Sequence, residues 1–251
     1  MYHEIERQGR ALAQAEPGYV RYVVREAEFH AQLDRLGILE FRGFSVSEGL
    51  SRDGSPQGVV ITFDDGCETD LAVAAPDLKS RDFNATFYLV AGLLGQKGYL
   101  STGQARELAE MGFEIGCHSM THAYLTELAA DELQAEIVKA KERLEQIIGR
   151  PVEHLSCPGG RWNQRVADLA RESGYKSVST SRIGANSPDS NPFHLKRVAI
   201  LRETSAATFS RICRGQGLMP MSVAQSIRSA VQLVLGNSTY DRLRGALLRR
   251  S

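Results

Sequence analysis

Two groups of residues have the types and spacing needed to hold a divalent metal and to move a proton. The first is the pair Asp64-Asp65, which follows the apolar run Gly58–Phe63 and precedes Gly66. Adjacent side chains that leave a strand point in different directions, so one carboxylate can bind a metal while the other faces a substrate. The alternative is a turn whose acids cap the next helix.

The second group is His118 and His122, which follow the apolar run Phe113–Cys117. Two histidines four residues apart meet on one side of a helical turn and can bind one metal ion, although such a pair alone is often structural. Together with an aspartate from another strand end, they form a two-histidine, one-carboxylate site with open positions for water and substrate. This set of ligands favours Zn2+ and also suits Co2+, Ni2+ and Fe2+.

The elements that must position these residues alternate between strands and helices. Strands are predicted at Gly58–Phe63, Ala85–Val90, Phe113–Cys117, Val152–Cys157, Lys176–Thr180 and Lys196–Ile200, with Met1–Ile5 as a candidate seventh. Apolar residues at helical spacing lie between the strands, at Phe29–Leu36, Ala105–Met111, Leu133–Ile148 and Asn163–Gly174. This alternation predicts parallel strands joined by helices, and six or seven such units fit an α/β barrel better than an open sheet. Reactive groups in such folds gather at the C-terminal ends of the strands.

The two groups together resemble the first two motifs of a known family. Thr62-Phe-Asp-Asp-Gly66 and His118-Ser-x-x-His122 are similar to motifs of the polysaccharide deacetylases, which carry the NodB-homology domain of carbohydrate esterase family 4. The resemblance implies a distorted (β/α)7 barrel and removal of the N-acetyl group from an amino sugar of a glycan or glycoconjugate. It also implies that Asp65, His118 and His122 hold the metal. Asp64 would be the general base for a metal-bound water that acts as the nucleophile.

The third motif departs from the family pattern. The family has Arg-x-Pro-aromatic-Gly, and this chain has Ser156-Cys157-Pro158-Gly159-Gly160, without the arginine that orients the base. Arg161 follows directly and is one candidate replacement, with a surface position as the alternative. By resemblance, the Gly159 N–H beside Pro158 would stabilise the oxyanion. Trp162 is a candidate wall of the sugar site and equally a candidate core residue.

The general acid also departs from the usual pattern. The family's Leu-x-His motif is replaced by Phe193-His194-Leu195, which does not match. However, Met1–Ile5 resembles the Tyr-His-containing first strand of the poly-N-acetylglucosamine deacetylases, in which an N-terminal histidine supplies the acid. His3 is therefore the preferred general acid, and His194 is the alternative.

The composition fits one large domain with a distinct C-terminal end. The 251 residues are 42% hydrophobic and 24% charged, with zero formal net charge, and the four cysteines lack the spacing of a disulfide framework or zinc finger. Residues 201–251 nevertheless contain eight arginines and two acids, a net charge of +6. We expect a barrel over residues 1–220 and a basic helical appendix over 221–251, which either contacts an anionic membrane or a phosphorylated substrate, or is a solvated face. No signal-peptide or membrane-spanning run is present, which predicts a cytoplasmic protein, peripheral to the membrane if the appendix binds it.

Two other functions remain open at this stage. The same fold and site could cleave another C–N bond, as in an imide or ureide, and an assay for acetate against ammonia would separate this activity from deacetylation. The altered third motif and the missing Leu-x-His motif also fit a catalytically weak glycan-binding protein. Retention of Asp64 argues against the latter, because a metal site alone does not need that acid. The preferred substrate is an N-acetylated amino sugar, either lipid-linked or phosphorylated, and no nucleic acid is expected.

Overall fold

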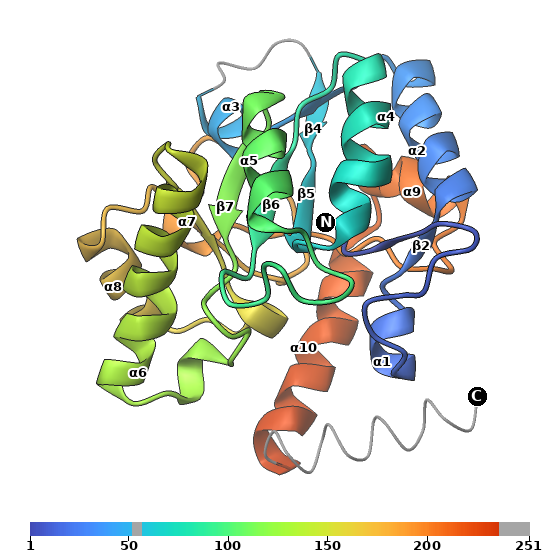
Figure 1. Cartoon of the computed structure of the whole chain (residues 1–251). Helices are drawn as coiled ribbons and strands as arrows, with labels where there is room; N and C mark the ends of the chain where they lie inside the picture. Colours follow the sequence, from blue (N-terminus) through green and yellow to red (C-terminus); the bar gives the residue numbers. More distant parts are fainter. Residues whose placement is uncertain (52–56, 236–251) are drawn as a thin grey trace.

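A curled parallel sheet forms the centre of the protein (Figure 1). The structure is a computed structural model that describes residues 1–51 and 57–235. The sheet has the order β5-β6-β7-β8-β9, with strands at Thr62–Asp65, Thr86–Leu89, Glu114–Cys117, His154–Ser156 and Ser177–Ser179. Each strand is joined to the next by helical structure, so the predicted alternation of strands and helices is confirmed.

Two strand-like segments extend this sheet at its edges. The Tyr2 N–H donates to Thr62 O at 2.8 Å beside β5, and Leu195 forms a parallel bridge with Ser179 on β9. The two segments meet where the Ile200 N–H donates to Met1 O at 2.9 Å. Met1–Ile5 and Lys196–Ile200 were predicted as strands. In the first segment Tyr2 forms a single bridge to Phe63 and Ile5 begins the short strand β1 (Ile5–Glu6), whereas Lys196–Ile200 is irregular and only the preceding Leu195 bridges to the sheet. The predicted fold class, a distorted barrel, is confirmed.

The connecting helices begin and end at recognisable sequence signals. They are η1 (Asp70–Ala74) with α4 (Ala75–Ser80), α5 (Thr102–Glu110), α6 (Ala130–Gln134) with η3 (Ala135–Lys139) and α7 (Ala140–Ile148), and α8 (Gln164–Glu172). Ser101 and Gln104 form the predicted capping box of α5. The predicted helix over Leu133–Ile148 contains a π-helical segment, η3, and it ends at Gly149 in the left-handed region.

Apolar side chains pack on the outer face of the sheet and polar ones fill its interior. Phe63 and Phe87 are register partners on β5 and β6, and their rings stack with centroids 4.7 Å apart. The next residue on each strand, Asp64 and Tyr88, is also buried, and the Tyr88 hydroxyl hydrogen bonds with Ser179 Oγ at 2.9 Å. Because side chains alternate along a strand, an apolar outer face directs the polar residues into the barrel.

The remaining elements surround the barrel. They are two parallel strand pairs, β1 (Ile5–Glu6) with β2 (Val24–Arg25) and β3 (Arg42–Phe44) with β4 (Gly58–Val60), and the helices α1 (Pro17–Val20), α2 (Glu26–Ile38), α3 (Val46–Leu50) and α9 (Ala206–Cys213). In the described part of the chain, no helix has the length and apolar character required to cross a membrane.

The C-terminal helix starts slightly earlier than predicted. Helix α10 covers Leu218–Leu235, whereas the helical appendix was predicted from Met221. The Gln225 side chain joins α10 to the barrel, since it donates to Ser181 O at 2.6 Å and accepts from the Ile183 N–H at 2.8 Å. The rest of the predicted appendix, residues 236–251, lies outside the described residues.

Candidate metal centre

Both acids of the Asp-Asp pair reach the same histidine at the end of β5. The Oδ2 atom of Asp64 lies 3.8 Å from His118 Nε2, and the Oδ1 atom of Asp65 lies 3.5 Å from the same nitrogen. Asp65 has a φ of 83°, in the left-handed region, so the regular alternation of side chains ends at this residue. Left-handed backbone at a residue other than glycine is costly and is concentrated at functional sites.

Three side chains converge at this point in a way that suits a cation. Asp65, His118 and His122 each offer one ligand atom, and these atoms lie within 4.8 Å of one another. The Asp65 Oδ1 atom is buried, has no hydrogen-bond partner in the described chain and lies 3.4 Å from His122 Nε2. A buried carboxylate oxygen without a hydrogen bond is expensive, and a divalent ion between these three groups would satisfy it. The residues predicted as ligands are therefore brought together, and they fit a metal.

The loop that carries the histidines is not the helical turn expected from their spacing. His118 follows β7, and the chain from there to His122 is irregular, with Ser119 and His122 in the left-handed region at φ of 70° and 66°. The buried carboxylate of Glu136, on η3, accepts hydrogen bonds from the N–H groups of Met120 and Thr121, both at 2.9 Å. A carboxylate anchored in a π-helical segment thus replaces helical hydrogen bonds as the support of this loop.

The electrostatic environment shifts the pKa values of the two histidines in opposite directions. Burial lowers the pKa of His118 to about 4, so its ring is neutral at neutral pH. His118 Nδ1 lies 2.9 Å from Ser156 O, and donation to this carbonyl leaves the Nε2 lone pair directed at Asp65. Burial opposes protonation of His122, but the neighbouring Asp65 carboxylate outweighs burial and raises its pKa. Neutral imidazole is the form that binds a metal.

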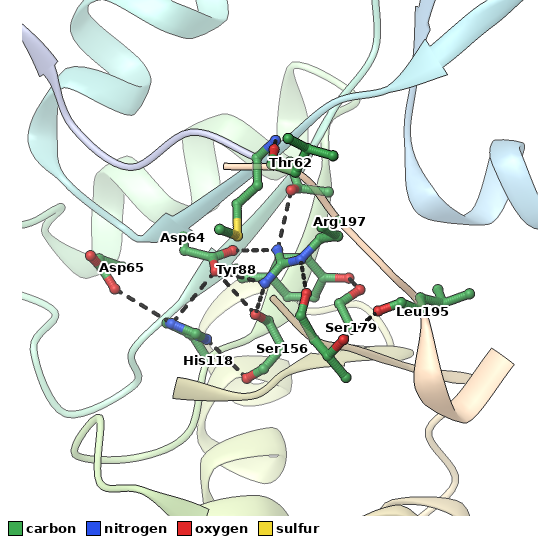
Figure 2. Close-up of polar contacts among 12 residues, drawn as sticks. Thr62, Asp64, Asp65, Tyr88, His118, Ser156, Ser179, Leu195 and Arg197 are labelled. Atoms are coloured by element: carbon green, nitrogen blue, oxygen red, sulfur yellow. Dashed lines mark hydrogen bonds and ion pairs between the residues drawn. The ribbon is translucent and has the colours of Figure 1, made fainter. Parts of the chain in front are cut away.

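Asp64 is held by Arg197 rather than by an arginine near the third motif. The two Nη atoms of Arg197 donate to Oδ1 and Oδ2 of Asp64 at 2.8 and 2.9 Å, and Nη2 also donates to Ser156 Oγ at 2.7 Å (Figure 2). Both partners are buried. Burial opposes ionisation of Asp64, but the guanidinium charge outweighs burial and lowers the pKa of this carboxyl well below its usual range.

Arg161, the predicted candidate for this contact, lies elsewhere. It forms an ion pair with Glu127, and its guanidinium stacks on the Tyr124 ring, 3.5 Å from the centroid. Pro158 and Gly159 do follow β8 at the metal end of the sheet, in the short helix η4 (Pro158–Gly160). Gly159 has a φ of 62°, and a Cβ atom there would lie 2.8 Å from the Tyr124 ring, so this position requires glycine.

The two candidate acids differ in their surroundings. His3 is electrostatically coupled to Asp65 and Asp64, while burial lowers its pKa. Burial also lowers the pKa of His194, but the charges that act on it belong to Arg182 and Lys196. His194 stacks against Trp162, whose Nε1–H donates to Phe193 O at 2.8 Å. Trp162 thus has the contacts of a packing residue, and the choice of His3 over His194 as the acid stays a prediction.

Sequence reasoning missed Arg197 and Glu136. Arg197 lies in the segment Lys196–Ile200, which was predicted as a buried strand, and an arginine in a buried strand is as expensive as the acids that drew attention to Asp64 and Asp65. That cost was the available signal. Glu136 had no comparable signal, because an acid in an amphipathic helix is ordinarily exposed.

With this geometry in place, comparison with known proteins identifies the family. The sequence model of the polysaccharide deacetylase family matches residues 51–178, half of the chain, and the chain belongs to this family. It is 28% identical to YxkH of Bacillus subtilis over 83% of this chain and 73% of YxkH. It is 30% identical to a peptidoglycan-N-acetylglucosamine deacetylase of Bacillus cereus over 48% of this chain, and spans 54% of that protein.

A solved structure supports the fold. The Streptococcus pyogenes deacetylase PplD, in complex with acetate, superposes with a TM-score of 0.73 over 84% of this chain and 94% of that chain, at 23% sequence identity. At this identity the likeness establishes the barrel fold alone.

Proposed function

We propose that this protein is a metal-dependent hydrolase that removes the N-acetyl group from an amino sugar of a glycan or glycoconjugate. Its membership of the polysaccharide deacetylase family supports a carbohydrate substrate. The observation that carries the proposal is that two groups of residues meet at the end of β5. These are a three-ligand cluster with an unsatisfied Asp65 oxygen, and a buried Asp64 held in one orientation by Arg197. A glycan-binding protein would need neither the second acid nor its buried cation.

Each residue then has one task. When bound by Asp65, His118 and His122, a divalent ion, Zn2+ by preference, supplies Lewis acidity, which polarises the amide carbonyl and acidifies water. Asp64 takes the proton from the attacking water, and Arg197 fixes the orientation of its carboxylate. The lowered pKa of Asp64 keeps its carboxylate ionised, which is the form that can accept a proton.

The later steps need an oxyanion donor and an acid. The Gly159 N–H, at the metal end of β8, is the proposed donor to the developing oxyanion. His3 protonates the leaving nitrogen, because an amide anion is too poor a leaving group to depart unprotonated. Its coupling to Asp64 and Asp65 supports this assignment over His194.

The test measures acetate released from chitooligosaccharides by the metal-loaded protein. Chelation should abolish release and added Zn2+ should restore it. Asp64→Asn should retain the metal and lose most turnover, whereas Asp65→Asn should lose metal affinity itself. Release of ammonia instead of acetate would reassign the scissile bond. Undiminished turnover in a metal-free preparation would refute the metal mechanism.

A further inference from the structure

A second cavity reaches Arg197 from outside the metal centre. Its volume is about 500 Å³, within the range of roughly 300–1,000 Å³ usual for small-molecule sites. Arg197 and Thr62 belong to its lining, whereas Asp64 and the three proposed metal ligands do not. Its walls come from the β3–β4 pair, from α3 and α9, and from residues 184–198, so it is a separate space from the metal centre.

The walls of this cavity are largely apolar, and part of its rim is exposed. Aliphatic and aromatic side chains line it, among them Leu36, Val46, Val59, Phe209, Ile212 and Leu218. Two further lining residues, Leu50 and Val60, are 44% and 43% exposed. They are two of the five large hydrophobic side chains exposed in the part of the chain whose burial is described. An apolar space with an exposed apolar rim suits a hydrocarbon chain, because each methylene that enters leaves water.

Among the described residues, the charged side chains of the lining have one sign. They are those of Lys196 and Arg197, and the described part of the lining contains no aspartate or glutamate. Arg197 is already paired with Asp64. Lys196 is exposed, and within the described residues its ammonium group has no ion pair or hydrogen bond. A cation at the edge of an apolar cavity selects an anionic headgroup.

We propose that this cavity binds a single-chain amphiphile with an anionic headgroup, with its alkyl chain along the apolar walls and its head at Lys196. A cationic amphiphile would meet Lys196 with the wrong charge. This binding function is separate from the deacetylase reaction and uses none of the three proposed metal ligands.

The binding test uses the full chain and a fluorescent fatty acid, 11-(dansylamino)undecanoic acid, below its critical micelle concentration. Saturable binding should be reversed by decanoate and dodecanoate. Each pair of added methylenes should tighten competition about tenfold until the cavity is full. Dodecylammonium should compete at least about tenfold more weakly than dodecanoate. Lysophosphatidate of equal chain length separates the two sources of such a ligand, since stronger competition by it assigns a lipid phosphate and weaker competition a free fatty acid.

Variants place the binding in this cavity. Lys196→Glu and Val60→Glu should each weaken probe binding by about tenfold or more, as both change exposed rim residues. Their controls are Lys97→Glu and Ile38→Glu, exposed residues outside the cavity, which should bind like the parent. Asp65→Asn should also retain binding, which keeps this result independent of the deacetylase assay. Absence of saturable binding, or equal losses in rim and control variants with native circular dichroism, would overturn the proposal.

Discussion

Arg197→Gln should separate the orientation of Asp64 from the metal site. The side chain donates to Asp64, Thr62, Ser156 and Thr180, none of which is a proposed metal ligand, so the variant should keep its metal stoichiometry. Removing one partner of a buried ion pair typically costs about 3–5 kcal/mol of folding stability. We therefore expect a lower midpoint of urea unfolding and a protein that still folds at low temperature.

Turnover should fall for a reason distinct from stability. General base catalysis contributes about 10²–10⁴-fold, and an unoriented Asp64 should forfeit about 10²-fold of it in kcat/KM. Burial, no longer opposed by the guanidinium, should raise the pKa of Asp64. Because the carboxylate must be ionised to accept a proton, activity is present above this pKa, and the acid limb of the pH profile should move to higher pH.

The assay is acetate release by the metal-loaded protein across pH 4–9 at a temperature where every variant is folded. Arg197→Lys keeps the charge but cannot form the bidentate pair, so its loss should be intermediate. Arg161→Gln is the matched control, because this arginine pairs with Glu127 and should matter little. If Arg197→Gln stayed within about threefold of the parent with an unchanged acid limb, Arg197 would not position the base.

Three further outcomes are expected. Burial opposes ionisation of Glu114, but hydrogen bonds, first that of His154, outweigh burial and lower the pKa of Glu114 to about 2 from 4.5. Glu114→Gln should therefore lower the free energy of unfolding by up to about 3 kcal/mol at pH 7. In urea unfolding, this difference between variant and parent should vanish as the pH falls from 4.5 towards 2. His3→Gln should reduce amide hydrolysis about 10²–10⁴-fold and hydrolysis of an activated acetyl ester much less, while His194→Gln changes little; the reverse pattern would move the acid to His194. The full chain should cosediment with anionic vesicles, more weakly at high salt, and a chain that ends at Pro220 should not; equal sedimentation would reduce the C-terminal helix to a solvated face.

The sequence predicted the parts of the site that depend on strand ends. Parallel strands place their C-terminal residues at one edge of the sheet, so an apolar run followed by Asp64-Asp65, and another followed by His118, had to bring these side chains together. The helices between the strands were predicted from the regular helical spacing of their apolar residues. Helix α9 was missed although Ser205 caps it, with Phe209 and Ile212 on its apolar side. The sequence therefore contained the capping residue and the apolar spacing that predict this helix.

The backbone conformation of the loop from His118 to His122 could not be predicted from the residues of the loop itself. Spacing of four residues fits a helical turn, but Ser119 and His122 adopt left-handed backbone, which is uncommon for residues other than glycine. The conformation is maintained by Glu136, whose carboxylate accepts from Met120 and Thr121 sixteen and fifteen residues earlier in the chain. Only tertiary structure reveals such support, because the residues that adopt the strained conformation do not encode it.

Arg197 makes the contact with Asp64 that was expected of the arginine missing from the third motif. What Asp64 requires is a buried cation beside it, and any strand that ends nearby can supply one. The segment of Arg197 follows Leu195, which bridges to β9, and meets the Met1–Ile5 segment, in which Tyr2 bridges to β5, so Arg197 lies between the two edges of the sheet. Ser156 on β8 is small enough to admit the guanidinium and hydrogen bonds with it. A third motif without arginine therefore does not imply an unoriented Asp64, because the contact across 133 residues of sequence holds this carboxylate as the proposed mechanism requires.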